Sequence, residues 1–162
     1  MSKADELAAK LKRKQDTRAD ADASADKAIE LWPAQVYEMY HQLETWLVPL
    51  SEAGLNIKRV STRVFESHAS GATFNYAIDQ LLIEGNHQSI TFDPVARFTI
   101  GGSGRVEIHA KGAERYMLRT GSEHGEGHWL IHTVPRAGQA RAKPVELNED
   151  NLLSVIEEGL DL

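Results

Sequence analysis

The chain has 162 residues, of which 41% are hydrophobic and 26% are charged, and its formal net charge is −6. This length favours one domain, and the composition excludes a collagen, a membrane span and a wholly disordered chain. The sequence contains no cysteine, which excludes disulfides, thiolate nucleophiles and thiolate metal sites. The polar start is not followed by a long apolar run, so we expect no signal peptide and a cytoplasmic protein.

The charge is unevenly distributed along the sequence. Residues 146–162 carry a net charge of −6, residues 57–145 carry +3, and residues 1–56 carry −3. The acidic total argues against bulk electrostatic binding of nucleic acid. The middle segment nevertheless has enough positive charge to form a local basic surface.

Residues 1–31 contain many Ala, Lys, Arg and Asp residues and few large apolar side chains. These residue types favour a helix, but so little apolar surface predicts a frayed helix or a flexible arm. A single domain is expected over residues 32–162. A basic cluster lies within the arm, at Lys10, Lys12, Arg13, Lys14 and Arg18. Its simplest interpretation is a solvated helix face, and the alternative is an arm that binds nucleic acid or a membrane.

The pair Trp32-Pro33 is expected to interrupt this first segment, because proline has no N–H for the preceding turn. The following residues predict an amphipathic helix at about 34–52. Its single apolar stripe is formed by Val36, Met39, Tyr40, Leu43, Trp46, Leu47 and Leu50. Gly54 is placed to cap the end of this helix, and the stripe is expected to belong to the core.

The apolar pattern changes to a period of two over residues 57–134. We expect about seven short strands, centred on residues 60–64, 74–83, 90–92, 98–100, 106–110, 116–118 and 129–131. Gly85-Asn86 is a hairpin turn signal, and the other connections are also short. The apolar positions change phase after Gln80, which predicts a bulge or a strand buried on both faces. The segment therefore predicts an antiparallel meander.

Residues 134–146 contain Pro135, Gly138 and Pro144 and predict a loop. A closing amphipathic helix is expected at about 149–160. Asn148 is placed to cap it, with Leu147 and Leu152 as a hydrophobic staple around the cap. Gly159 is expected to weaken its last turn.

No established catalytic motif occurs in the sequence. His124, His128 and His132 recur every four residues, but the glycines around them break a helix, and in a strand His128 and His132 lie about 13 Å apart. Residues 101–104 are followed by a strand pattern, which favours a hairpin turn over a phosphate loop. We therefore expect no enzyme, no metal site and no cofactor. Whether His124 and His128 in the loop 121–128 hold any ligand stays open.

The most informative pattern is a set of arginines on the predicted strands, namely Arg59, Arg63, Arg105, Arg115 and Arg119. They fall on the phase opposite the apolar residues, which predicts that they gather on one polar sheet face. One interpretation is an exposed face balanced by Glu107 and Asp79, since surface ion pairs contribute little. A second is a contact with an acidic element, either the chain's own C-terminal helix or a partner protein. A third is nucleic acid, which the expected burial of the strand aromatics disfavours because no stacking platform remains.

A closing helix after an antiparallel meander of about seven strands resembles the pleckstrin-homology-like roll over residues 57–160. The resemblance is one of topology, with no shared sequence motif, and it implies a fold rather than a function. The helix–sheet–helix order in a small acidic chain also resembles type III secretion chaperones, which are dimeric and bind unfolded effector segments. Seven strands exceed that family's pattern. Two short parts of the sequence are similar to small bacterial proteins without an assigned activity. They are residues 46–50 with 54–55, and residues 100–101 with 104–106.

These observations predict an α+β fold with an N-terminal helix, an antiparallel meander of about seven strands and a C-terminal capping helix. The leading functional hypothesis is a non-enzymatic bacterial interaction protein, such as an adaptor, a chaperone-like factor or an inhibitor. It is expected to bind a protein with an acidic surface through the five arginines and to self-associate through the N-terminal helix. The alternative is a nucleic-acid or anionic-ligand binding protein that uses residues 10–18 and the sheet face.

Overall fold

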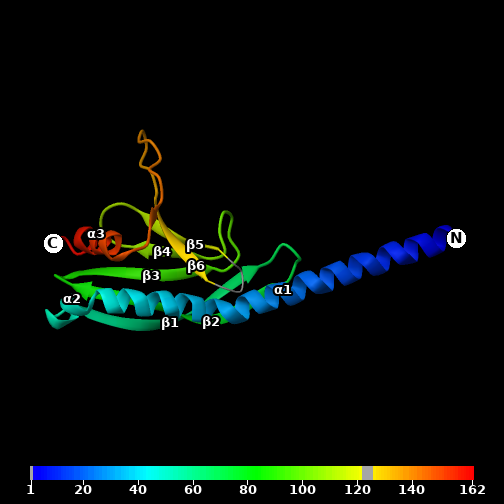
Figure 1. Cartoon of the computed structure of the whole chain (residues 1–162), viewed down its shortest axis with the longest axis horizontal. Helices are drawn as coiled ribbons and strands as arrows, with labels where there is room; N and C mark the ends of the chain where they lie inside the picture. Colours follow the sequence, from blue (N-terminus) through cyan, green and yellow to red (C-terminus); the bar gives the residue numbers. More distant parts are fainter. Residues whose placement is uncertain (1, 122–125) are drawn as a thin grey trace.

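The computed structural model describes residues 2–121 and 126–162. Two helices at opposite ends of the sequence cover an antiparallel sheet, and the first helix extends far beyond it (Figure 1). The elements in chain order are α1 (Lys3–Trp46), α2 (Val48–Glu52), β1 (Asn56–Ser67), β2 (Thr73–Gly85), β3 (Gln88–Ala96), β4 (Arg105–His109), β5 (Arg115–Gly121), β6 (Gly127–Thr133), β7 (Val145–Glu146) and α3 (Glu149–Gly159).

The expected α+β class and antiparallel meander are confirmed. Each strand pairs with its neighbours in the sequence, in the order β1-β2-β3-β4-β5-β6-β7. The described strands form an open sheet with β1 and β7 at its two edges, rather than a closed roll. The hairpin turn predicted after Gly85 is present, with Asn86 and His87 both at positive φ.

The identity of the seventh strand differs from the sequence prediction. Residues 98–100 do not form a strand, and the short strand β7 lies instead within the loop expected at 134–146. The reason is the carboxylate of Glu66 on β1, which accepts hydrogen bonds from the backbone N–H groups of Arg97 (2.9 Å) and Phe98 (2.9 Å). Backbone donors that bond a side chain are not available to a strand ladder, so the chain leaves the sheet after β3.

The prediction that Pro33 interrupts the first helix is wrong, because α1 continues through it to Trp46. A proline inside a helix removes one hydrogen bond, here to the Ile29 carbonyl, at a cost of about 3 kcal/mol. Trp32 and Val36 flank the proline and are fully buried against the sheet. Burial of two such side chains offsets a cost of that size. The helix predicted at 34–52 is therefore the second half of α1, followed after Leu47 by the short helix α2.

The core lies between the sheet and the helices α1 and α3. The buried stripe of α1 and the apolar face of α3 pack against one face of the strands, and both belong to a single hydrophobic cluster. Trp32 lies directly on the backbone of Gly104, where any Cβ would overlap the indole ring. Gly159 is the last residue of α3 and allows that helix to approach Ile90 closely, because a Cβ there would overlap the Ile90 side chain. The predicted Asn148 cap is confirmed, since its side chain accepts from the Asn151 N–H.

Two tyrosines of α1 fix the helix to the sheet at the point where β2 and β3 separate. Continuing the β2–β3 register by two residues would place Pro94 opposite Asp79, and proline has no N–H to donate. The Asp79 carbonyl accepts instead from the Tyr40 hydroxyl (2.7 Å), and the Asp79 N–H donates to the Tyr37 hydroxyl (2.9 Å). Burial raises the pKa of Tyr40 well above its usual value, so its hydroxyl stays protonated as a donor.

Tyr40→Phe is expected to lower the free energy of unfolding by about 1–3 kcal/mol, because it leaves the Asp79 carbonyl without this donor in a partly buried position. Urea titration followed by circular dichroism measures the change. Tyr116→Phe is the matched control, since the Tyr116 hydroxyl makes no hydrogen bond with any described residue and this variant should match the parent. Equal stability of the two variants would contradict the role given to Tyr40.

Candidate interaction surfaces

The five predicted arginines do not gather on one face of the sheet. Strand β5 explains the difference, because both of its phases carry apolar residues. The structure places Met117 in the core, so its neighbours in phase, Arg115 and Arg119, lie on the helix-covered face. Leu118 lies on the opposite face, where Gly101 in the β3–β4 connection packs against it. The prediction that Arg115 and Arg119 lie on the polar phase of this strand, opposite the core, was therefore wrong.

Arg115 holds α3 against the sheet. Its guanidinium forms an ion pair with Glu158, which also accepts a hydrogen bond from the Ala113 N–H (3.1 Å). The hydrogen bond from Arg115, followed by that from Ala113, lowers the pKa of Glu158 below its usual value. Arg115 therefore makes the contact with the chain's own C-terminal helix that was one of the alternatives considered for the arginines.

Arg119 is 3% exposed and lies at the inner wall of a cleft between α1 and the strands β5 and β6. Burial lowers its pKa, and the Glu38 carboxylate acts in the opposite direction. Its guanidinium donates to the Ser103 hydroxyl (3.3 Å) and fills the space where a Cβ on Gly127 would lie. The arginine therefore supports the packing of this region from inside.

The cleft has a volume of about 520 Å³. Its described lining residues are Gln35, Glu38, Met39, Gln42, Trp46, Arg119, Glu126, Gly127, His128, Trp129, Glu146 and Leu147. Three carboxylates accompany one guanidinium, and this described lining contains no serine, threonine or cysteine nucleophile.

Arg105 lies on the sheet face that the helices leave uncovered. Its guanidinium is 3.9 Å from the centre of the Tyr116 ring, and the His132 ring stacks on the same tyrosine at 4.9 Å. Burial, followed by the charges of Arg141 and Arg105, lowers the pKa of His132, so its ring is neutral at neutral pH. This stack contradicts the expectation that all strand aromatics are buried. The acid Glu107 is paired with Arg105 (3.3 Å), so this face is mixed in charge.

Arg59 and Arg63 lie on β1, the outermost strand of the sheet. Arg59 contacts α1, with its guanidinium 4.9 Å from the centre of the Tyr37 ring and 3.4 Å from the Glu44 carboxylate. Arg63 donates to the Asn75 side chain (3.0 Å). Lys58 adds a third positive charge on the same strand. The structure thus brings together only these two of the five predicted arginines.

Phe65, also on β1, was not singled out by the sequence analysis. Its side chain is 75% exposed, although phenylalanine is strongly apolar. The alternation around Val64, which is buried, identifies Phe65 as outward-facing, so its position was readable from the sequence. An exposed phenylalanine beside exposed positive side chains marks this strand as the principal candidate surface.

Comparisons of the chain with protein-family models, with curated proteins and with solved structures find no match. Within residues 2–121 and 126–162, no helix is both long and apolar enough to cross a membrane. The same residues contain no group of three His, Asp or Glu side chains arranged to hold a metal ion. His124, one of the three regularly spaced histidines, lies outside the described residues.

Glu158→Gln is expected to destabilise the protein at neutral pH and to match the parent in acid. A folded-state pKa below the unfolded value means that the unfolded chain takes up this proton first as the pH falls. The stabilisation is therefore present above the unfolded value and is lost as the pH falls through the folded one. Thermal unfolding from pH 7 into the acid range measures it, with Glu157→Gln as the control. A difference between variant and parent that persists unchanged in acid would contradict the assignment.

Proposed function

We propose that the chain is a non-enzymatic interaction protein, of the adaptor, chaperone-like or inhibitor kind, which binds an acidic segment of a partner protein along β1. The observation that carries the proposal is the open edge of this strand. It is 12 residues long, it is the last strand of the sheet, and most of its side chains are exposed. Its exposed charged residues are Lys58, Arg59 and Arg63, all of them positive.

An unpaired strand edge offers a row of backbone donors and acceptors to an added strand. The positive side chains of β1 favour acidic residues on that added strand, because opposite charges across an antiparallel pair are stabilising. The internal partners of Lys58 and Arg59 are the exposed carboxylates Glu84 (2.9 Å) and Glu44 (3.4 Å). Exposed ion pairs of this kind contribute little, so exchanging them for a partner's carboxylates is inexpensive.

Phe65 supplies the apolar part of the same surface. Buried aromatic anchors contribute much of the affinity of protein interfaces, and charged residues around them add specificity and rate. Val60 is also partly exposed on this strand. A partner strand that covers Phe65 and places carboxylates near Arg63 therefore matches the surface in both shape and charge.

Charge reversal by Arg63→Glu, combined with Phe65→Ser, is expected to abolish capture of the partner, because it removes the anchor and reverses the charge beside it. The measurement is a pull-down with the tagged full chain after nuclease treatment, quantified by mass spectrometry. Arg136→Glu, an equal charge change on the exposed loop 134–144, is the control and should retain the partner. Retention of the partner by the β1 variant would refute this surface.

Nucleic acid is the second candidate, and the stack of Arg105, Tyr116 and His132 favours it. Aromatic rings beside cations bind unstacked bases, and the neighbouring loop adds Arg136, Arg141 and Lys143. This candidate predicts oligonucleotide affinity that falls steeply with salt, since phosphate contacts release counterions. Fluorescence anisotropy across a salt series measures it, and Tyr116→Ala should weaken binding at every salt concentration. Absence of binding at low salt would eliminate this candidate.

Self-association through the N-terminal part of α1 belongs to the same proposal. This segment projects from the molecule and makes little contact with the remainder (Figure 1). An interaction protein with such an extension has a second surface that is independent of β1.

A further inference from the structure

The backbone of β1 has two alternating sets of hydrogen-bonding groups. In an antiparallel pair of strands, residues opposite each other alternate between pairs that exchange hydrogen bonds and pairs that do not. At the closed end of the β1–β2 hairpin, the His68 N–H donates to the Ala72 carbonyl (2.8 Å), so these two residues form a bonded pair. The register continues without a break as far as Asn56 opposite Glu84. The even-numbered residues of β1 therefore bond β2.

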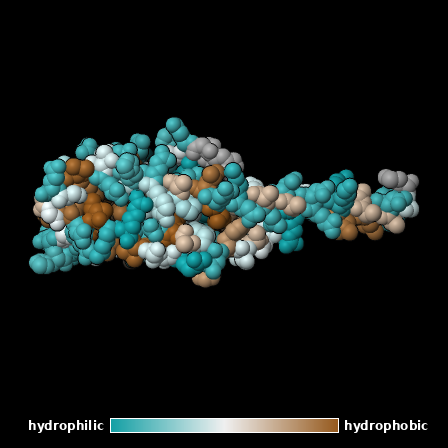
Figure 2. Space-filling model, turned by 90° about the horizontal axis from the view of Figure 1, so that it is seen from below, coloured by the Kyte–Doolittle hydropathy of each residue, from teal (hydrophilic) through white to brown (hydrophobic). Residues whose placement is uncertain are grey.

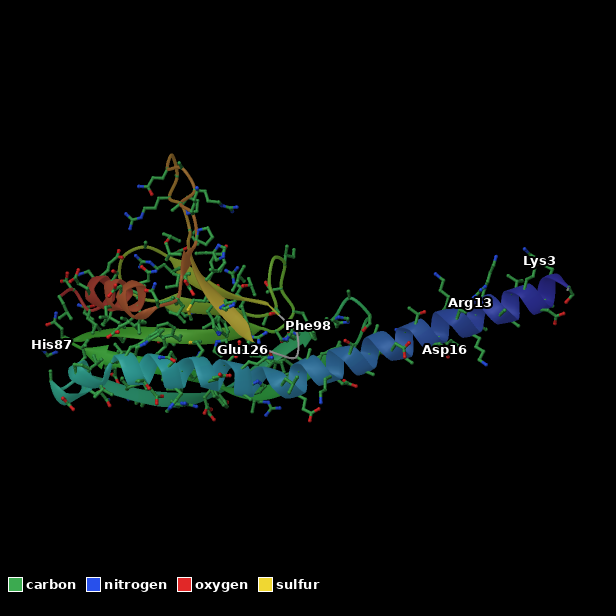
Figure 3. The ribbon with its side chains drawn as sticks, in the orientation of Figure 1. Lys3, Arg13, Asp16, His87, Phe98 and Glu126 are labelled. Carbon is green, nitrogen blue, oxygen red and sulfur yellow. The ribbon has the colours of Figure 1, made fainter. Side chains whose placement is uncertain are left out.

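The odd-numbered residues of β1 direct their N–H and C=O groups to the open edge of the sheet. Asp79 gives an independent check, because it lies opposite Ser61 while both of its backbone groups bond tyrosines of α1. Ser61 is thus in a non-bonded pair, as the alternation requires. β1 follows the lower side of the body from the end marked by His87 towards the end marked by Phe98 (Figures 1 and 3), and no other strand of the described chain lies beyond it. Its odd-numbered backbone groups are consequently available to an added strand.

The same odd-numbered positions carry the side chains of the candidate surface. Arg59, Ser61, Arg63 and Phe65 share one side of the pleat, because alternate residues of a strand point to the same face. All four are exposed. Figure 2 views the lower side of the body, where hydrophobic spots are separated by hydrophilic side chains. A residue of an added strand that bonds the backbone of one of these four residues also lies beside its side chain.

The side chains at these positions favour different residues opposite them. Phe65 is 75% exposed and favours an apolar residue. Arg63 donates to the neutral Asn75 side chain and forms no ion pair with a described residue, so it favours a carboxylate. Arg59 already pairs with Glu44 (3.4 Å), so a carboxylate opposite Arg59 adds less. A second copy of β1 would bring its own positive side chains to this edge, which disfavours a second copy as the occupant.

We propose that the partner segment adds to β1 in the antiparallel direction and carries an apolar residue followed, two and six positions later, by acidic residues. This inference rests on the proposed function, of which it specifies the partner. The apolar residue lies opposite Phe65, the first acid opposite Arg63 and the second acid opposite Arg59. The residue four positions after the apolar one lies opposite Ser61 and is small and polar. The antiparallel direction is favoured because antiparallel pairs are slightly more stable per residue than parallel pairs.

Amide hydrogen exchange of the full chain, measured by NMR, tests the geometry of the edge. In the free protein, the amides of Ser61 and Arg63 should exchange more than about tenfold faster than those of Thr62 and Val64, because only the even-numbered amides are bonded to β2. Binding of the partner segment should slow the odd-numbered set. Equal protection of the two sets in the free protein overturns the proposal.

A synthetic peptide tests the spacing of the partner's residues. The probe is fluorescein-labelled Thr-Leu-Thr-Glu-Thr-Thr-Thr-Glu-Thr. The control peptide has both glutamates moved one position towards its N-terminus, so that the leucine and the glutamates no longer face the same side of a strand. Fluorescence anisotropy with the full chain should show that the probe binds roughly three- to tenfold more tightly than the control. Arg63→Glu should remove this preference, and a probe with lysine at its fourth position should bind this variant as the original probe binds the parent. Equal binding of probe and control to the parent overturns the proposal.

The variant Arg63→Glu with Phe65→Ser separates this inference from the proposed function. Probe and control that bind the parent equally, and that both fail to bind this variant, defeat the spacing alone. A probe that does not bind the parent, while the same variant abolishes partner capture in the pull-down, also defeats the partner pattern alone. Probe binding that this variant leaves intact defeats β1 as the site and therefore both proposals.

Discussion

The missing N–H of Pro94 is the constraint on which the remaining architecture depends. The backbone of Asp79 would otherwise continue the ladder into β3, and here both of its groups bond tyrosines of α1 instead. A buried carbonyl or N–H without a partner costs about 1–3 kcal/mol, so α1 has a defined place and orientation on the sheet. The same junction explains the change of inward phase in β2, where Ile78 and Leu81 are both buried although they lie on opposite phases of the strand.

Separation of β2 from β3 lets the far part of the β1–β2 hairpin follow α1. Glu66 secures that part, because its carboxylate accepts from the backbone after β3 and from the Tyr76 hydroxyl. The hairpin consequently covers α1 as far as Arg18. Beyond that point the helix has no sheet beside it, although it is already nucleated by the docked half and adds turns at little cost. The extension of α1 is thus a consequence of where the hairpin ends.

Local patterns predicted the elements whose determinants lie close in the sequence. The Asn148 cap, the turn after Gly85 and the antiparallel alternation are examples, and each depends on a few consecutive residues. The continuation of α1 through Pro33 and the loss of a strand at 98–100 depend on contacts between distant segments, which periodicity does not contain. The arginine face failed for a related reason: β5 has apolar residues on both phases, and only packing decided that Met117 points inward. The exposure of Arg59 and Arg63 on β1 was predictable from the sequence, because the alternation along this strand places them opposite the buried Val64.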